Sequence, residues 1–217
     1  MPPLEGRAAV IALLSSMLKE AQEDRPAEIE LRLGRIVDGA YESGVTHDQF
    51  ERVVARLRAG VGLVPAGAES GGVAFTHEVH SEGGSIRNTE TGHCTRKLRM
   101  RQTLFHIVGS SLAVRVCQSA EERVSPPRVR PRCRGNAETA VRAKLRESFV
   151  YKQKARYDCT RCVTANVTSG MLTVPRCTYE VEVEAVGAIS AESLLLKMED
   201  VVGFLEPSHK GYAVHVG

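Results

Sequence analysis

Two short segments near opposite ends of this 217-residue chain carry a charged side chain at every second position. They are Glu28, Glu30 and Arg32 in the first segment and Glu180, Glu182 and Glu184 in the second. Because side chains alternate between the two faces of a β-strand, each set shares one face and aliphatic residues take the other. The plain interpretation is a half-exposed strand whose glutamates stay in water. If such a stripe were buried, its charges would repel one another and favour binding of protons or a cation.

Cations and hydroxyls follow the same alternation in four further segments. Their shared faces hold Ser85, Arg87 and Thr89; Lys97, Arg99 and Arg101; Lys144, Arg146 and Ser148; and Arg156, Asp158 and Thr160. In a closed barrel covered outside by helices, such faces would line an enclosed polar lumen. Carboxylate oxygens select hard ions such as Mg²⁺ or Mn²⁺. Carboxylates, a hard ion and basic side chains around one cavity are suited to phosphoryl transfer.

Hydrophobic periodicity predicts the elements that must position these residues. It predicts helices over residues 5–23, from a capping box at Thr46 to about Arg58, and over 190–205 with Ser190 as N-cap. Alternation predicts strands at 28–36, 73–80, 84–89, 94–108, 111–118, 141–151, 154–168 and 177–186, whereas 60–72 is Gly/Ala-rich loop. The expected fold is α+β and mainly β: an eight-stranded antiparallel β-barrel with flanking helices, its strands spanning roughly 27–186.

Composition and length exclude several classes of protein. The chain has 29 Lys+Arg and 26 Asp+Glu, and a net charge of +3 does not by itself indicate nucleic-acid binding. No apolar stretch approaches the ~20 residues that span a bilayer, and the N-terminus lacks the pattern of a secretory signal, so no membrane partner is expected. The length fits one domain over 1–217. A Pro/Arg-rich loop over 123–136 interrupts the strands, and either RNA attraction or a solvated insert would explain it.

The cysteines do not indicate a metal site. All six are expected to be reduced thiols. The Cys159-x-x-Cys162 pair lacks the second ligand pair that a structural zinc site needs.

A series of motifs resembles, in the same order, those of the triphosphate tunnel metalloenzymes. They are Glu28-x-Glu30-x-Arg32-x-Gly34, Ile86-Arg87-x-Thr89-x-Thr91-Gly92, Lys144-x-Arg146-x-Ser148-Phe149, Arg156-Tyr157-Asp158-Cys159-Thr160 and Glu180-x-Glu182-x-Glu184. Within that group the chain resembles the metal-dependent RNA 5′-triphosphatases of fungal and protozoan mRNA capping, and its size suits the protozoan members.

The resemblance implies roles for individual residues. Mg²⁺ or Mn²⁺ would be held by Glu28, Glu30 and Glu184. Phosphate oxygens would be contacted by Arg87, Lys97, Lys144 and Arg146. In the catalytic set, Glu182 and Glu180 would order the attacking water, and Arg156 with Asp158 would brace the tunnel.

Three positions depart from the family pattern or leave an alternative open. The place of Lys97 could be taken by Arg99, because several cations follow one another there. The tunnel aspartate that should precede Arg87 has no counterpart between Val79 and Ser81. An additional tunnel glutamate corresponds to either Glu121 or Glu122, and the sequence does not decide between them.

The implied activity is removal of the γ-phosphate from 5′-triphosphate-ended RNA, which is the first step of mRNA 5′ capping. Nucleoside triphosphates would be further substrates with Mn²⁺, a capping guanylyltransferase would be a partner, and the protein would act in the nucleus. Three alternatives remain open: a thiamine or inorganic triphosphatase of the same superfamily, a non-catalytic scaffold with the tunnel fold, and an ordinary β-domain with solvated charged faces.

Overall fold

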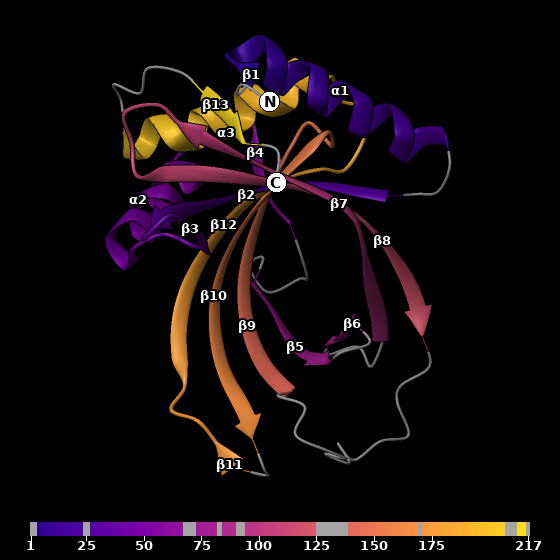
Figure 1. The fold of residues 1–217 in the computed structure, drawn as a ribbon, viewed down its shortest axis with the longest axis vertical. Helices are drawn as coiled ribbons and strands as arrows, with labels where there is room; N and C mark the ends of the chain where they lie inside the picture. Colours follow the sequence, from indigo (N-terminus) through magenta and orange to yellow (C-terminus); the bar gives the residue numbers. More distant parts are fainter. Residues whose placement is uncertain are drawn as a thin grey trace.

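Eight strands pair antiparallel in a ring in the computed structural model (Figure 1). The model describes residues 4–23, 27–66, 73–81, 84–89, 94–124, 139–168, 171–206 and 212–215. In order of pairing the ring runs β2 (Ala27–Val37), β8 (Leu112–Val124), β7 (Cys94–Ile107), β6 (Gly84–Thr89), β5 (Val73–Ser81), β9 (Thr139–Tyr151), β10 (Ala155–Thr168) and β12 (Arg176–Ala185). It returns to β2 through a short pairing centred on Val183 and Leu31. The predicted eight-stranded tunnel architecture is confirmed.

Five short strands extend this ring and were not predicted. They are β3 (Ala40–Ser43) on β2, β4 (Leu63–Ala66) on β9, β11 (Met171–Leu172) on β10, and β13 (Tyr212–His215) on β7, with β1 (Leu4–Glu5) on β13. The prediction of loop throughout 60–72 is therefore wrong at β4. Strands of two to four residues are too short to show alternation, and they form because a neighbouring strand offers its free edge.

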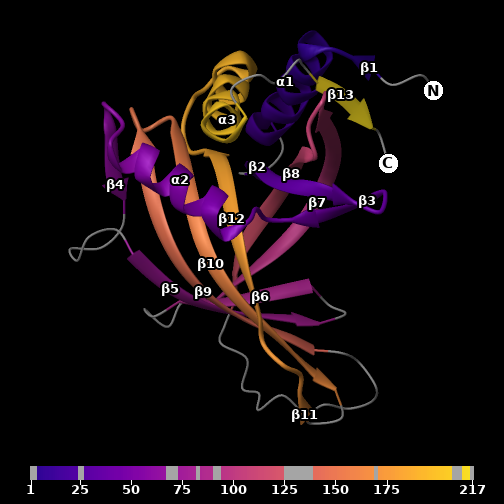
Figure 2. The same ribbon diagram turned by 90° about the vertical axis from the view of Figure 1, so that its left-hand side faces the viewer.

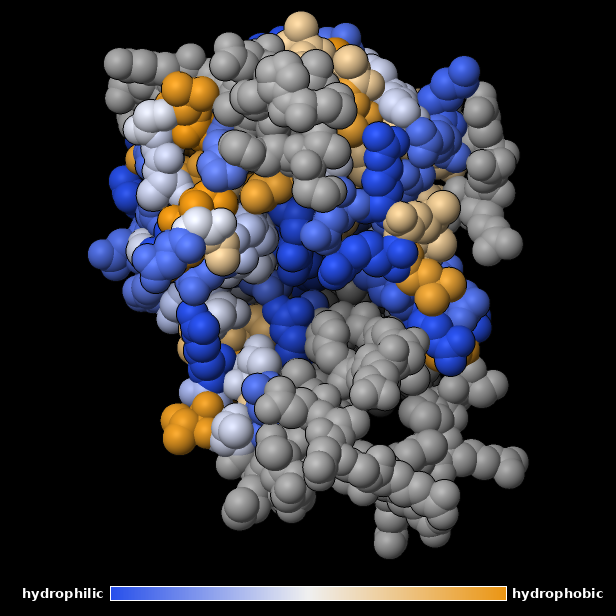
Figure 3. Space-filling model, viewed as in Figure 1, coloured by the Kyte–Doolittle hydropathy of each residue, from blue (hydrophilic) through white to orange (hydrophobic). Residues whose placement is uncertain are grey.

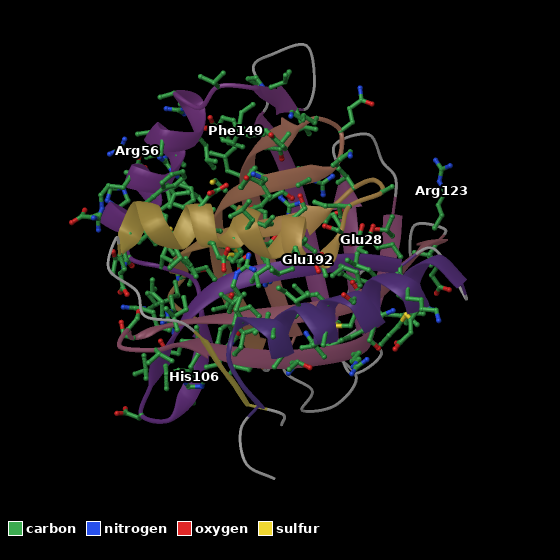
Figure 4. The ribbon with its side chains drawn as sticks, turned by 90° about the horizontal axis from the view of Figure 1, so that it is seen from above. Glu28, Arg56, His106, Arg123, Phe149 and Glu192 are labelled. Atoms are coloured by element: carbon green, nitrogen blue, oxygen red, sulfur yellow. The ribbon has the colours of Figure 1, made fainter. Side chains whose placement is uncertain are left out.

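Among the described residues, three helices cover the outside of the ring: α1 (Arg7–Glu23), α2 (His47–Arg58) and α3 (Ala191–Leu205). Helices α1 and α3 lie side by side across the top of Figure 1, and Figure 4 shows them from above. Figure 2 shows α2 crossing the outer side of β12. No helix within the described ranges is long and apolar enough to cross a bilayer.

The predicted helix starts hold at α2 and α3 but not at α1. The Thr46 side chain accepts from the Gln49 amide, and the Gln49 side chain accepts from the Thr46 amide, which is the predicted capping box. Ser190 caps α3. The predicted start of the first helix at residue 5 is wrong, because Gly6 has a φ of 107° that separates strand β1 from the helix at Arg7.

Aliphatic faces of the ring strands pack against the helices and form the hydrophobic core. Its strand members include Ile29, Leu31, Leu33, Val114, Val116, Val181 and Val183, and its helical members include Leu14, Met17, Leu194, Leu195 and Met198. Since side chains alternate along each strand, packing this set outward sends the charged set into the ring. The hydrophobic pattern therefore determines which residues face the interior.

Strand β8 is longer than predicted. It continues to Val124 because its backbone pairs with β7 up to Cys94. The predicted strand end at 118 and the predicted start of the basic loop at 123 are therefore wrong, and Glu121 and Glu122 lie inside the strand. The remainder of the loop, residues 125–136, lies outside the described residues.

Two adjacent leucines of α3 test the packing of the helices on the ring. Leu195 is fully buried, whereas Leu196 is 46% exposed. Leu195→Ala should lower the free energy of unfolding by about 2–5 kcal/mol, because it leaves a cavity in the core. Leu196→Ala, the matched control, should change it by about 0.5 kcal/mol or less. Urea unfolding followed by circular dichroism measures both, and equal effects of the two substitutions would contradict this packing.

Candidate functional site

Both glutamate stripes face the interior of the ring. Glu180 and Glu182 are 2% exposed, Glu30 is 5% exposed and Glu184 is 9% exposed. Glu30 lies directly opposite Glu184 on the neighbouring strand, so their Cα atoms are roughly 5 Å apart. The interpretation of these residues as a half-exposed strand with glutamates in water is therefore wrong.

Arg32 is the cation that joins the two stripes. Its Nη2 lies 2.9 Å from Glu30 Oε1 and also contacts Glu182, and its Nη1 lies 3.7 Å from Glu180 Oε1. Burial opposes the charged form, but Glu182 and the other carboxylates outweigh it and raise the pKa of Arg32 further. Arg32 shares the face of Glu28 and Glu30 in the sequence, but no role was predicted for it. Its position in the alternation was the signal that could have identified it.

Asp158 of β10 is the centre of a second network. It accepts hydrogen bonds from Ser148 Oγ at 2.6 Å, Arg146 Nη1 at 2.9 Å and Arg156 Nε at 3.1 Å. Arg156 also donates from Nη2 to Glu184 Oε2 at 2.5 Å. This chain of contacts links β9, β10 and β12 across the interior. It holds the guanidinium groups of Arg146 and Arg156 in fixed orientations.

Lys97 lies between two of the predicted metal ligands. Its Nζ is 3.2 Å from Glu28 Oε2 and 3.1 Å from Glu30 Oε2; Figure 4 labels Glu28. The ammonium group therefore occupies a position where two carboxylates attract a cation. Lys144, another predicted phosphate contact, is 2% exposed on the interior face of β9.

Two of the interior glutamates resist ionisation. Burial raises the pKa of the Glu184 carboxyl to about 8, against the opposing charge of Arg156 and with a further contribution from Glu28. Burial also raises the pKa of Glu182, although Arg32 opposes the rise. A cation beside these groups would favour their charged forms and release protons.

Nearby cations favour the ionised form of the other two interior glutamates, Glu30 and Glu180. Burial opposes the charge of Glu30 as well, but Arg32 and Lys97 outweigh it and hold the pKa of this carboxyl well below its usual range. At Glu180, Arg32 and Arg142 overcome burial in the same way and lower its pKa. The tunnel thus places carboxyl groups of raised pKa beside carboxyl groups of lowered pKa.

The predicted ligand set consists only of carboxylate oxygens, and this chemistry fits a hard divalent ion. Glu28 and Glu30 share the face of β2 that lies opposite Glu184. As placed, no three acidic, histidine or cysteine side chains of the described residues converge tightly enough to enclose an ion. Lys97 and Arg156 instead pair with these carboxylates.

Strand register locates the two positions that the sequence left open. Glu121 lies opposite Lys97 and so shares the interior face, whereas Glu122 lies opposite Arg96 and pairs with it at 3.0 Å on the exposed side. Glu121 is therefore the additional glutamate on the tunnel face. The register of β5 places Glu78 opposite both Arg142 and Arg87. Glu78 precedes the segment Val79–Ser81 in which the missing aspartate was expected.

Side chains of 67–94 lie outside the described part of the structure, and this range includes the predicted phosphate contact Arg87. Its backbone is on β6, opposite Glu78 and Thr95. Arg142, which was not predicted, donates from Nη2 to Glu180 Oε1. It belongs to the charged face of β9 because it precedes Lys144 by two residues, which is the signal that could have found it.

Comparison with known proteins gives structural neighbours only: no protein-family model and no curated protein sequence matches the chain. The Mimivirus capping enzyme triphosphatase has a TM-score of 0.63 and 12% identity, covering 93% of this chain and 99% of that one. The S. pombe Pct1 RNA triphosphatase has a TM-score of 0.59 and 16% identity, covering 92% and 89%. A second Pct1 structure, in complex with the Spt5 CTD, has a TM-score of 0.59 and 14% identity, covering 92% and 88%. These likenesses establish that the chain has the fold of the RNA triphosphatases, as the motifs predict.

Replacing Glu184 by glutamine should stabilise the metal-free protein at alkaline pH. The pKa of Glu184 is about 8 in the folded state and 4.5 as its ordinary value. The unfolded state therefore loses the carboxyl proton at lower pH than the folded state. The free energy of unfolding consequently falls as pH rises from 4.5 to about 8. Glu184→Gln removes that loss. Its melting temperature should exceed that of the parent by several degrees at pH 8.5, since about 1 kcal/mol shifts Tm by about 2–4 °C at this size.

Thermal unfolding in chelator at pH 5, 7 and 8.5 measures this difference, with Glu122→Gln on the exposed side as the control. The difference in melting temperature between Glu184→Gln and the parent should increase with pH. An advantage that is constant or shrinks as pH rises would contradict the assignment.

Proposed function

We propose that this chain removes the γ-phosphate of 5′-triphosphate-ended RNA in a metal-dependent hydrolysis that gives diphosphate-ended RNA and inorganic phosphate. This is the first step of mRNA 5′ capping. The observation that carries the proposal is a set of buried glutamates facing arginines and lysines inside one tunnel, in a chain with the fold of RNA triphosphatases. We place the activity in the nucleus and expect a capping guanylyltransferase as a partner.

The metal would be Mg²⁺ or Mn²⁺, held by Glu28, Glu30 and Glu184. A bound divalent ion neutralises charge on the triphosphate and polarises a phosphoryl oxygen. The chain contributes three oxygen donors from two paired strands. Proton release from Glu184 would accompany metal binding, because burial keeps this carboxyl protonated otherwise.

Basic side chains would bind and orient the phosphates. Arg146 is already oriented by Asp158 and by Thr160 Oγ1, 3.2 Å from its Nε. Lys144 on the same strand and Arg87 on β6 would share this role, and Lys97 lies next to the predicted metal ligands. Such fixed cations stabilise the charge that spreads over the phosphoryl oxygens in the transition state.

Glu180 and Glu182 are the candidates to orient the attacking water. Glu180 Oε2 is buried without a hydrogen-bond partner among the described residues, so it offers an acceptor to a water molecule. Burial raises the pKa of Glu182, which moves it toward the range in which a carboxylate accepts a proton effectively at neutral pH.

Hydrolysis of nucleoside triphosphates in Mn²⁺ is part of the same proposal, because the γ-phosphate group is the same. A thiamine or inorganic triphosphatase would use the same tunnel chemistry. Relative rates on triphosphate-ended RNA, tripolyphosphate and thiamine triphosphate distinguish these activities. The RNA substrate is expected to give the highest kcat/KM.

Glu30→Gln tests the metal site while keeping the size of the side chain. It should reduce phosphate release from triphosphate-ended RNA by at least about 10²-fold, the scale seen when one electrostatic contact to a transition state is removed. Glu122→Gln, on the exposed side of β8, should leave the rate unchanged, whereas Glu121→Gln on the tunnel face should lower it.

Rates are measured as release of γ-labelled phosphate with Mg²⁺, with Mn²⁺ and in excess chelator. Near-parental turnover of Glu30→Gln at saturating Mn²⁺ would rule out the metal assignment. Full activity of the parent in chelator would rule out metal dependence altogether.

A further inference from the structure

Arginines gather at the end of the tunnel that lies away from Glu28 and Glu184. A cavity of about 520 Å³ opens there, and among the described residues Glu180 is the only acidic one that lines it. The arginine mouth, as we name this set, consists of Arg32, Arg99, Arg115, Arg142 and Arg176. Figure 3 shows strongly hydrophilic side chains gathered around a hollow in the middle of this face.

Strand geometry gives the tunnel two chemically different ends. Along β12 the interior positions run from Glu184 to Arg176, a distance of roughly 26 Å at about 3.3 Å per residue. Along β2 they run in the same sense from Glu28 to Arg32. Arg176 and Arg142 therefore lie at the end of the tunnel away from Glu184. Arg32 lies between this end and the predicted metal ligands and contacts Glu30.

The outer arginines of the mouth have few acidic partners among the described side chains. Arg32 and Arg142 pair with Glu180. Within the described residues, by contrast, Arg99 and Arg115 have no acidic partner, and Arg115 stacks over the Tyr41 ring at 5.1 Å. Arg176 reaches Glu42 only at 3.9 Å, and its side chain is 74% exposed. Several like charges around one cavity attract an extended polyanion.

We infer that the arginine mouth binds the phosphodiester backbone of single-stranded RNA behind the 5′-triphosphate, so that RNA enters the tunnel from this end. The inference rests on the proposed function and adds the direction and the polymer specificity of the substrate. A triphosphate alone would reach the interior cations, but only a longer chain would also contact the outer arginines. The mouth thereby favours RNA over free nucleotides.

Neutral polar groups in the same cavity support a nucleic acid rather than inorganic polyphosphate. Thr164, Asn166 and Thr178 line it together with the arginines. Hydroxyl and amide groups can bond both to phosphate oxygens and to the ribose 2′-hydroxyl, which polyphosphate lacks.

The double variant Arg99→Ser/Arg176→Ser tests this role without touching the residues proposed for metal or triphosphate binding. The control is Arg96→Ser/Arg101→Ser, which removes the same charge from the exposed side of β7, where these arginines pair with Glu122 and Glu20. The prediction that Arg101 shares a face with Lys97 and Arg99 is wrong, because the strand register shifts between Arg99 and Arg101. Binding of a fluorescent single-stranded oligoribonucleotide with a 5′-triphosphate is measured in chelator at several salt concentrations. Long-chain polyphosphate is titrated in parallel, and kcat/KM is measured for the same RNA and for tripolyphosphate.

Two lost phosphate contacts should lower the salt slope of RNA binding by about 1.4, since each contact to a single strand contributes about 0.7. At 0.1 M salt the same relation gives a loss of roughly 25-fold in RNA affinity. The kcat/KM for RNA should fall in proportion, whereas that for tripolyphosphate should stay within about twofold of the parent. The control variant should bind RNA like the parent.

An unchanged salt slope, an equal loss in the control, or weaker binding of polyphosphate without weaker binding of RNA would overturn the inference. Failure of the proposed function has a different signature. In that case the parent protein releases no phosphate from any substrate, while the loss of RNA binding in the double variant still reports on the arginine mouth.

Discussion

Burial of like charges inside the ring is the constraint on which the rest of the structure depends. An isolated carboxylate that is removed from water costs several kcal/mol, and neighbouring carboxylates resist joint ionisation. Here Arg32, Lys97 and Arg156 are held among the glutamates. The charged interior is stable because each anion has a cation at close range. The same cations would attract a polyanion that enters, so the proposed substrate binding would use the side chains that neutralise the glutamates.

The outer face of the same strands makes this interior possible. Leu31 and Val183 lie one residue from Glu30 and Glu182 and pack against the covering helices. A slip of one residue in strand register would exchange the two faces, burying charge in the core and exposing the aliphatic residues. Core packing therefore specifies the register, and the register specifies which groups meet across β2, β12 and β10.

Period-two alternation and the capping residues allowed the fold to be predicted from the sequence. The alternation around Glu30 and Glu182 identified the two strands, and Thr46 and Ser190 located the starts of two helices. The short strands escaped prediction because two to four residues carry no periodic signal. The position of Glu121 on the tunnel face escaped it too, because this depends on pairing with Lys97, a contact between residues far apart in the chain.

The ion-pair partner of each charged side chain was the feature of the site that the sequence predicted least well. Alternation shows that Arg32 and Lys97 share a face with the glutamates, but only the closed ring shows which carboxylates they reach. The family motifs indicated the right strands and order. They could not indicate that Lys97 lies between Glu28 and Glu30, because no local spacing encodes a contact across the ring.

The central claim is that carboxylates from both ends of the chain form one site for a divalent ion inside the tunnel. A crystal grown with Mn²⁺ tests it most directly, because anomalous scattering locates the ion without reference to activity. The account predicts a single strong peak within about 2.5 Å of carboxylate oxygens of Glu28, Glu30 and Glu184. A fully bound ion elsewhere, or a tunnel without an ion at saturating Mn²⁺, would contradict it.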